Sequence, residues 1–478
     1  MTSLTQALSV ALSGLQTTTG LISVASDNIS NANTPGYSNK TANVASLDFG
    51  AEGGGSTITS YTRTTDPTLT NNYNAATSTA SYTGTLNSYM TQVQAILDST
   101  ASNPTLTSDI SNFASAWTQY SAQPESSIQQ QNVINAGKQL ASDIQTIAAN
   151  VGTLNTQVQS DTSTTVTSLN SALKHIASLN SQIQLATTSG QNATDLQDQR
   201  DTAINQLSTY LSVTSESRSN GEIAVYTTGG QLLVDGPTST SFSYDGTNVK
   251  DQTGAPVNGS LTGGSLQAEL DFRDPNQVTS TSPGVATIPK MQSQLSAIVA
   301  AFVNQPGGST SLFANAYSNA ASASTATTAT QHGDTVDNNF FQASFNAGVA
   351  NSSSFVVNPD LLNGTSQIPQ TGTQAIAGTF TTTANYTASG LTANGVTYTQ
   401  LGAQVLSGFQ QSANILSTQN TTNASQQSYY KTTLASTTGV NVDTQLANLV
   451  IYQNSYAASA HVITTVNNML STLISSIG

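Results

Sequence analysis

Apolar side chains recur at steps of four and three residues over a long stretch at each end of the chain. A 3.5-residue period sustained over such lengths predicts a seam that packs on another helix. We therefore predict two terminal coiled-coil helices that bring the N and C termini together and also pack on neighbouring subunits. The predicted seam residues are Leu4, Leu8, Ala11, Leu15, Ile22, Ala25 and Ile29 at the N-terminal end, and Val442, Leu446, Leu449, Tyr456, Ala460, Ile463, Leu470, Ile474 and Ile477 at the C-terminal end.

The alternative is that both stretches are ordinary amphipathic helices of a single bundle. Their length argues against this, because at 1.5 Å per residue the seams extend over roughly 39 and 54 Å. Charge argues against it too, since no Lys or Arg precedes Lys40 and only Asp443 is charged after Lys431. Helix faces that meet only water usually carry Lys and Glu. Neutral faces favour contact with protein on more than one side.

The middle of the chain alternates between helical and strand-like patterns. A helical period runs from about residue 68 to 211 and returns at 291–303 and 401–429. A period of two predicts hairpins around Gly229-Gly230 and Asp245-Gly246. Phenylalanines between 340 and 380 suggest a second β region, and the glycines at 53–55 a flexible bridge.

The predicted fold class is mainly α with inserted β domains. It combines the terminal coiled-coil helices, an elongated helical-bundle rod and small outer β domains. The predicted domains are 1–60 with 436–478 (terminal coiled coil), 61–211 with 275–304 and 396–435 (helical rod), 212–274 (inserted β domain) and 305–395 (second β-rich outer domain).

Composition narrows the classes of function. The chain has 24 acidic and 10 basic residues among 478, a net charge of −14 and no cysteine. The basic residues are scattered, which excludes the basic patch of a nucleic-acid binder, and an anionic membrane would repel the chain. We find no run of eighteen apolar residues that could span a bilayer and no ordinary cleavable signal peptide. We expect neither nucleic-acid nor membrane partners, and either a cytoplasmic protein or export without a cleaved signal.

Candidate catalytic and metal-binding residues are few. His175, His332 and His461 are widely spaced, and no metalloprotease, P-loop or nucleophile-elbow motif occurs. The acidic run from Asp334 to Asn339 lacks the central Gly of a calcium loop. Because no nucleophile or second base accompanies them, we interpret Asp195, Asp198, Arg200 and Asp201 as a surface ion-pair cluster. We predict no catalytic, cofactor or metal site and no enzyme activity.

The N-terminal helix is predicted to end at a type II turn. Thr34 precedes a proline and is therefore pushed out of the helical region, and Pro35-Gly36 is the favoured central pair of such a turn. The segment Asp27 to Tyr37 resembles the signature of bacterial flagellar rod, hook and hook-associated proteins. Its family-signature residues are Asn28, Asn31, Asn33, Thr34, Pro35, Gly36 and Tyr37.

Other segments strengthen this resemblance. Residues 439–460 are similar to the closing helix of the same family, although Thr444-Gln445 stands where the family often carries two acidic residues. Residues 195–201 and 270–274 resemble the hook-associated members that join hook to filament. The length and these two segments argue against a hook or distal rod protein. A secreted adhesin is the alternative outside the family, and it has no need for paired terminal heptads.

The resemblance implies a structural protein of the flagellum, placed extracellularly at the hook-filament junction after uncleaved export through the flagellar channel. Its implied partners are copies of itself, the hook protein and a second junction protein, hook-associated protein 3. It further implies an export chaperone that binds the C-terminal helix.

Overall fold

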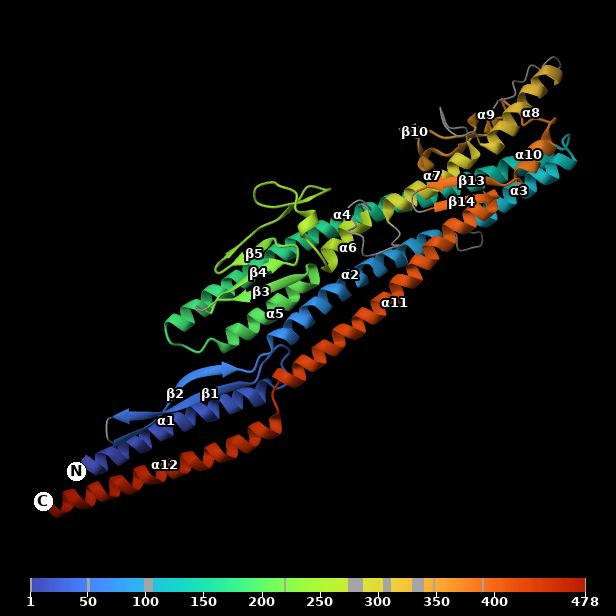
Figure 1. Ribbon diagram of the computed structural model, residues 1–478. Helices are drawn as coiled ribbons and strands as arrows, with labels where there is room; N and C mark the ends of the chain where they lie inside the picture. The colour runs from blue at the N-terminus through green and yellow to red at the C-terminus, as the bar shows by residue number, and fades with distance from the viewer. Residues whose placement is uncertain are drawn as a thin grey trace. The chain divides into compact units, whose positions relative to one another are not determined.

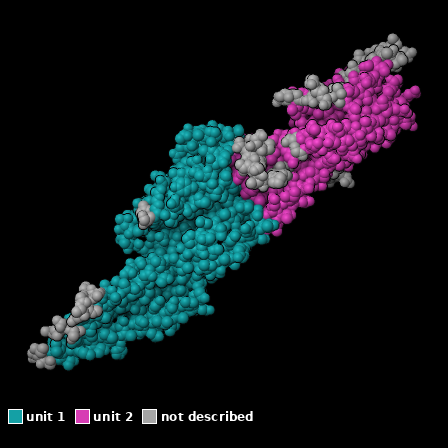
Figure 2. Space-filling view, in the orientation of Figure 1, with its two compact units in different colours: residues 1–81, 165–265, 422–478 teal, residues 82–164, 266–421 magenta. Residues whose placement is uncertain are grey.

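The computed structural model describes residues 2–49, 52–98, 106–218, 221–273, 287–303, 311–328, 339–346, 349–388 and 391–477. Their backbone is mostly helical with small antiparallel sheets, as the sequence predicted. The chain divides into two compact units, coloured separately in Figure 2. Unit 1 comprises Met1–Ser81, Thr165–Ser265 and Thr422–Gly478, and unit 2 comprises Tyr82–Thr164 and Leu266–Thr421. The four-domain division from the sequence is finer, and its boundaries remain predictions.

Unit 1 contains both ends of the chain, a long hairpin and a small sheet (Figure 1). Its complete elements are α1 (Thr2–Asn31), β1 (Lys40–Phe49), β2 (Glu52–Arg63), α5 (Thr194–Tyr210), β3 (Val213–Ser217), β4 (Ile223–Thr227), β5 (Leu232–Asp235), β6 (Thr238–Ser239), β7 (Ser243–Tyr244), β8 (Val249–Lys250) and α12 (Val442–Ile477). Strands β3 to β6 form an antiparallel sheet in chain order. The predicted hairpins at Gly229-Gly230 and Asp245-Gly246 are confirmed as β4–β5 and β7–β8.

Unit 2 is built mainly of helices, several of which are continuous in the chain with helices of unit 1. Its complete elements are α3 (Leu106–Ala122), α7 (Ile288–Phe302), α8 (Leu312–Thr328), β9 (Phe341–Gln342), β10 (Phe345–Asn346), β11 (Val349–Ala350), β12 (Val356–Val357), α9 (Pro359–Leu362), α10 (Thr373–Thr379), β13 (Ala384–Ala388) and β14 (Leu391–Val396). Helices α2 (Pro67–Asp98), α4 (Ser127–Thr188), α6 (Gly264–Arg273) and α11 (Tyr398–Thr438) contribute residues to both units.

Aromatic side chains form the centre of the unit 2 core. Phe113 and Trp117 on α3 are fully buried, and their rings meet at 6.3 Å between centroids. Phe340 lies 5.3 Å from Phe113 and 5.8 Å from Trp117. The phenylalanines that suggested a separate β domain therefore serve the helical core. Region 305–395 differs from the expectation, since it holds α8, α9 and α10 besides strands of two to six residues.

The glycine run at 53–55 is a strand rather than the flexible bridge that the sequence suggested. It lies in β2, where Gly55 pairs with Leu47 of β1. A Cβ on Gly55 would stand 1.8 Å from the Ser13 hydroxyl, and the backbone there has φ +104°. Glycine is required because the hairpin approaches α1 closely.

The segment Leu4–Asn31 of α1 is long and apolar enough to cross a membrane by length and composition, with a mean hydropathy of 1.3. This corrects the sequence analysis, which looked for an uninterrupted apolar run. The small polar residues Ser13, Thr17 and Thr18 interrupt the run without making it strongly polar. Thr17 and Thr18 are buried within unit 1.

Two glycines of α4 offer a matched test of the unit 2 core. Gly137 is buried, and a Cβ there would approach the Phe340 ring to 2.6 Å, whereas nothing lies within 4 Å at Gly152. We expect Gly137→Ala to destabilise unit 2 by about 1–3 kcal/mol through overpacking. Gly152→Ala is expected to stabilise the helix by roughly 0.5–1 kcal/mol.

Urea unfolding followed by Trp117 fluorescence measures both changes. If Gly137→Ala were neutral or stabilising, the tight packing of Phe340 on α4 would be wrong.

Candidate functional site

The two terminal helices lie side by side in unit 1 (Figure 1). They approach closely where small residues meet, since a Cβ on Gly14 would stand 3.3 Å from the Ser459 hydroxyl. Among the predicted seam residues of α1, Ala11 and Ala25 are buried, and the remainder are half-buried: Leu4, Leu8, Leu15, Ile22 and Ile29. The α1 seam therefore faces largely inward in this chain.

The predicted seam of α12 is divided between two environments. Leu449, Ala460, Ile463 and Leu470 are half-buried, whereas Val442, Leu446, Tyr456 and Ile474 are exposed. Ile477 belongs to the last turn of the helix. A strict 3.5-residue step drifts around a straight helix, so one sequence seam covers more than one structural face.

Hairpin β1–β2 packs along another side of α1. The Thr17 hydroxyl donates to the Ser56 carbonyl at 2.9 Å, and the Ser56 amide donates to the Ser13 hydroxyl at 3.2 Å. Hydroxyls on the helix thus bond strand backbone, which explains why this face carries Ser and Thr. Helix α1 is held between the hairpin and α12.

The predicted type II turn after α1 is present. The Tyr37 amide donates to the Thr34 carbonyl at 3.1 Å, and Gly36 has φ +82°, the left-handed value that the third position requires. A Cβ on Gly36 would stand 2.3 Å from the Thr202 hydroxyl of α5. Both backbone conformation and space therefore require glycine at this position. Asn33, Thr34 and Pro35 remain exposed.

Asn28 is the fully buried centre of the family-signature segment. Its amide nitrogen donates to the Lys40 carbonyl at 2.8 Å and to the Gln445 side chain at 3.2 Å. Its amide oxygen accepts from the Lys40 amide and the Tyr37 hydroxyl, both at 3.0 Å. One side chain therefore links α1, the turn, the start of β1 and α12, and its capacity for four hydrogen bonds is filled.

An ion-pair cluster fastens the hairpin to α5, and we name its members Lys40, Arg63, Asp195, Asp198 and Asp201 the clasp. Lys40 and Arg63 are directly opposite in the register of β1 and β2. Like charges in that position repel unless an anion lies between them. Asp198, 7% exposed, supplies it, with carboxylate oxygens 3.4 Å from the Lys40 ammonium and 3.0 Å from the Arg63 guanidinium.

The clasp is completed by neighbouring groups. Asp195 also pairs with Lys40, and Asp201 lies 2.6 Å from Arg63. The Ser38 hydroxyl donates to Asp198 at 2.6 Å. The Lys40 ammonium stands 4.0 Å from the centroid of the Tyr37 ring, which adds a cation–π contact.

Burial is the main influence on the titrating groups here. It lowers the pKa of Lys40 although Asp198 opposes it. Burial would likewise lower the pKa of Arg63, but the charges of Asp201 and Asp198 outweigh it and raise the net value. Burial, assisted by Asp27 and Asp198, raises the pKa of Tyr37 to about 12. Tyr37 therefore stays a hydrogen-bond donor to Asn28 at ordinary pH.

The sequence analysis was wrong about the partners of the acidic cluster. Arg200 is buried rather than on the surface, and it donates to the Asn180 side chain at 3.0 Å and the Gly221 carbonyl at 2.7 Å. Burial lowers its pKa to about 10. Arg200 points away from Asp198 because it is two positions away on the helix. The actual partners, Lys40 and Arg63, lie 135 or more residues before the acidic cluster in the chain. No local sequence pattern predicts pairs at such a distance.

Cavities of unit 1 flank the signature turn on two sides. One of about 570 Å³ is lined by Pro35, His175 and Asp195 among others. One of about 380 Å³ is lined by Pro35, Arg63 and Lys431 among others. The turn therefore stands as an exposed ridge between two hollows.

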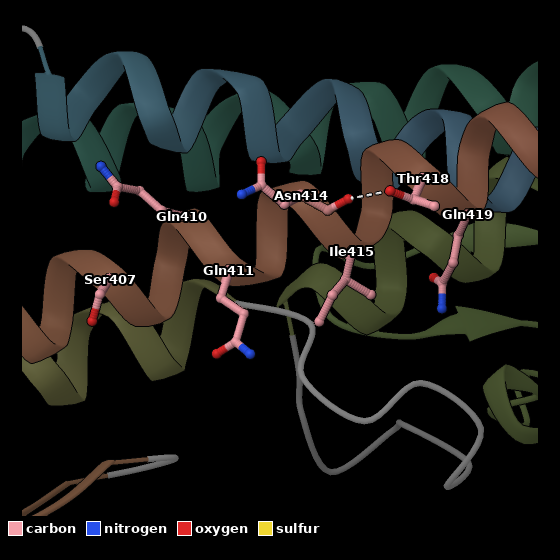
Figure 3. Close-up of a pocket in the computed structure, with 7 residues that line it drawn as sticks. All are labelled: Ser407, Gln410, Gln411, Asn414, Ile415, Thr418 and Gln419. Carbon is pink, nitrogen blue, oxygen red and sulfur yellow. Dashed lines mark hydrogen bonds between the residues drawn. The ribbon is translucent and has the colours of Figure 1, made fainter.

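A further hollow in unit 2 lies along α11 (Figure 3). All its lining residues come from that one helix: Ser407, Gln410, Gln411, Asn414, Ile415, Thr418 and Gln419. They offer amides, hydroxyls and one apolar side chain. The Thr418 hydroxyl donates a hydrogen bond to the Asn414 carbonyl at 2.9 Å. This lining provides neither an acid nor a base for catalysis.

Metal-binding geometry was also sought among the candidate residues. Within the described ranges, no group of three or more His, Asp or Glu is placed to hold a metal ion. His175 and His461 are exposed. His332 and residues 334–338 of the acidic run lie outside the described residues.

Comparison with known families gives three matches along the chain. The flagella basal body rod protein model matches residues 8–37, which contain most of α1 and the signature turn. The flagellar basal body rod FlgEFG C-terminal model matches residues 435–476, which contain nearly all of α12. Between them, the model of the flagellar hook-associated protein FlgK helical domain matches residues 90–306. The chain thus resembles flagellar hook-associated protein 1.

Individual relatives carry the same family name. The chain is 24% identical to flagellar hook-associated protein 1 of Bacillus subtilis over 247 residues, covering 49% of this chain and 48% of the relative. It is 26% identical to the Escherichia coli protein over 236 residues, covering 48% and 43%. The chain thus spans a little less than half the length of these relatives. The flagellar hook junction protein FlgK of Burkholderia pseudomallei aligns with a TM-score of 0.42 at 24% identity, covering 52% of this chain and 44% of that one.

In this chain, the clasp can be tested by removing its central carboxylate. We expect Asp198→Ala to destabilise unit 1 by about 3–5 kcal/mol, because Lys40 and Arg63 are left buried and unneutralised. Asp235→Ala is a matched control, since its pairing with Arg218 is 43% exposed on both sides. An exposed pair contributes less than about 1 kcal/mol.

Hydrogen exchange of the Ser38 and Lys40 amides provides the local readout, and urea unfolding followed by far-ultraviolet circular dichroism the global one. Equal losses in the two variants would contradict a central role for Asp198.

Proposed function

We propose that this chain is a structural junction protein of the bacterial flagellum, which joins hook to filament by assembling through its terminal helices. The observation that carries the proposal is a second, exposed apolar stripe on α12, beside the face that is buried in unit 1. The resemblance to relatives named as hook-associated proteins supports it.

The second stripe, which we call the outer stripe, is exposed along most of α12. Its large members are Ile451 (59% exposed), Val462 (45%), Met469 (54%) and Leu473 (38%). Two exposed alanines belong to the same stripe: Ala447 precedes Ile451, and Ala458 lies between Ile451 and Val462. Spacings of four and seven residues place these side chains on one face. The half-buried residues Leu449, Ile463 and Leu470 lie roughly a third of a turn away. Helix α12 thus has two apolar faces, and the described residues cover only one of them.

Burial of the outer stripe by another subunit is energetically favourable. Each Å² of apolar surface removed from water contributes roughly 25 cal/mol. The neutral Ser, Thr, Asn and Gln side chains beside the stripe allow identical helices to pack in parallel without charge repulsion. Isolated helices are marginal in water, so the stripe is best satisfied in an assembly.

Within this proposal, the seam residues that remain exposed on α12 (Val442, Leu446, Tyr456 and Ile474) extend the subunit contact. The exposed turn from Asn33 to Gly36 is a second contact, since it stands between two hollows of unit 1. The proposed partners are copies of the chain, the hook protein and hook-associated protein 3, with an export chaperone on α12 before assembly. The proposed location is the hook-filament junction, reached through the flagellar channel.

Two substitutions on the outer stripe test the proposal. We expect Ile451→Asp with Val462→Asp to leave a folded monomer, because both side chains are exposed. The variant should nevertheless fail to enter flagella, giving hooks without filaments and flagellin in the medium. Electron microscopy of cells and an assay for secreted flagellin measure this, beside cells that lack the gene.

Asn454→Asp with Asn468→Asp is the charge-matched control, since both residues are exposed and polar and do not belong to the outer stripe. This control should assemble normally. Normal filaments in cells carrying the Ile451 and Val462 variant would contradict the outer-stripe contact. Missing hooks in cells that lack the gene would instead favour a hook or rod role.

A further inference from the structure

Unit 2 buries a carboxyl group in surroundings that differ from those of the clasp. The clasp of unit 1 surrounds Asp198 with cations. Unit 2 buries Asp109 at 2% exposure and Asp271 at 3%. Buried carboxylates are costly without a cation or several donors. The proton is the alternative way to neutralise them.

Asp109 is the carboxyl group whose negative charge would be the most costly to bury. It lies in the first turn of α3, and among the described residues neither of its carboxyl oxygens has a hydrogen-bond partner or measurable contact with solvent. The group within hydrogen-bonding reach is the carboxyl of Asp143 on α4. Two ionised carboxylates only accept hydrogen bonds, so this contact is repulsive unless a proton lies between them.

Two other helices beside α3 bring no charged side chain to this place. Helix α10, which packs against α3, contains no ionisable side chain, and the unit 2 part of α11, which meets α3 at Gly402 and Ile110, contains only Tyr398. Asp143 is half-buried and accepts from the Gln139 side-chain amide at 2.9 Å. Asp143 thus has a donor of its own, whereas no described residue donates to the Asp109 carboxyl.

We propose that Asp109 and Asp143 share one proton in the folded protein, so that unit 2 becomes more stable as the solution becomes more acidic. Asp109 is the protonated member and donates to the Asp143 carboxylate. This inference concerns unit 2 alone and is independent of the proposed junction function.

The direction of the effect follows from linkage. Burial and the Asp143 charge raise the pKa of Asp109 from 3.8 to about 8. A group whose pKa is higher in the folded protein contributes stability that is complete below its unfolded pKa. That contribution is lost as pH rises through the folded pKa, here between about pH 4 and 8. Burial also raises the pKa of Asp271 to about 6, so the range from pH 6 to 8 isolates Asp109 best.

A metal ion is the competing way to neutralise the pair. Two carboxylates supply too few ligands, since calcium takes six to eight oxygens and magnesium demands an octahedron. A change in the stability of unit 2 on adding calcium or magnesium at constant pH would overturn the proton assignment.

The single tryptophan of the chain, Trp117, lies on the same helix as Asp109 and is fully buried in unit 2, which makes it a specific reporter. Urea unfolding of the full chain would be followed by Trp117 fluorescence from pH 6 to 9. For the natural chain, we expect the folding equilibrium constant to fall by up to about tenfold per pH unit up to pH 8.

Asp109→Asn should remove this dependence and raise the midpoint above pH 8, because the amide donates to Asp143 without a titrating proton. Glu125→Gln is the control, since Glu125 is exposed in the same unit and its removal should leave the slope unchanged. The same slope in Asp109→Asn as in the natural chain would overturn the proposal.

Infrared spectroscopy of the natural chain gives a second test that needs no variant to fold. At pH 7 we expect the carbonyl band of a protonated carboxylic acid, which shifts on exchange into deuterium oxide and disappears above pH 9. The absence of such a band at pH 7 would equally overturn the proposal.

Discussion

The charge of Asp198 is the interaction on which the geometry of unit 1 depends. The base of hairpin β1–β2 places Lys40 opposite Arg63, and this arrangement is stable only with an anion between the two cations. Asp198 on α5 is that anion. The hairpin in turn lies along α1, and α1 lies along α12. A single buried carboxylate therefore fixes where the terminal helices stand relative to α5.

The scarcity of charge in this chain gives each charged residue more weight. Only 7% of residues are charged, so most polar contacts are made by amides and hydroxyls. Asn28 shows the consequence, because its neutral side chain joins four segments by hydrogen bonds. A buried charged side chain at the same place would need an opposite charge to neutralise it. The two units use their few charges differently. Unit 1 pairs the buried carboxylate of Asp198 with cations, whereas unit 2 buries Asp109 beside another acid.

Local patterns predicted the elements well and the long-range pairings poorly. The terminal helices and the Pro35-Gly36 turn were predictable because periodicity and fixed φ values act over a few residues. Hairpin β1–β2 was missed because its strands are rich in Gly, Ser and Thr, which pack on the small hydroxyl-bearing face of α1 rather than in an apolar core. The clasp was missed because no local rule connects Asp198 to residues 135 positions earlier. The outer stripe was not predicted because a single 3.5-residue repeat per helix describes only one apolar face.

The two-sided character of α12 and the clasp have complementary consequences. Helix α12 has two apolar faces, and among the described residues only one of them is covered, so burial of the other by a neighbour would add to its stability. Such an end would be free to pack in many orientations if the rest of unit 1 did not restrict it. The buried bonds of Asn28 to Gln445 and of Asp198 to the hairpin restrict it. The chain thus combines an exposed apolar face with a fixed direction in which that face is presented, and the proposed assembly of identical subunits would use both.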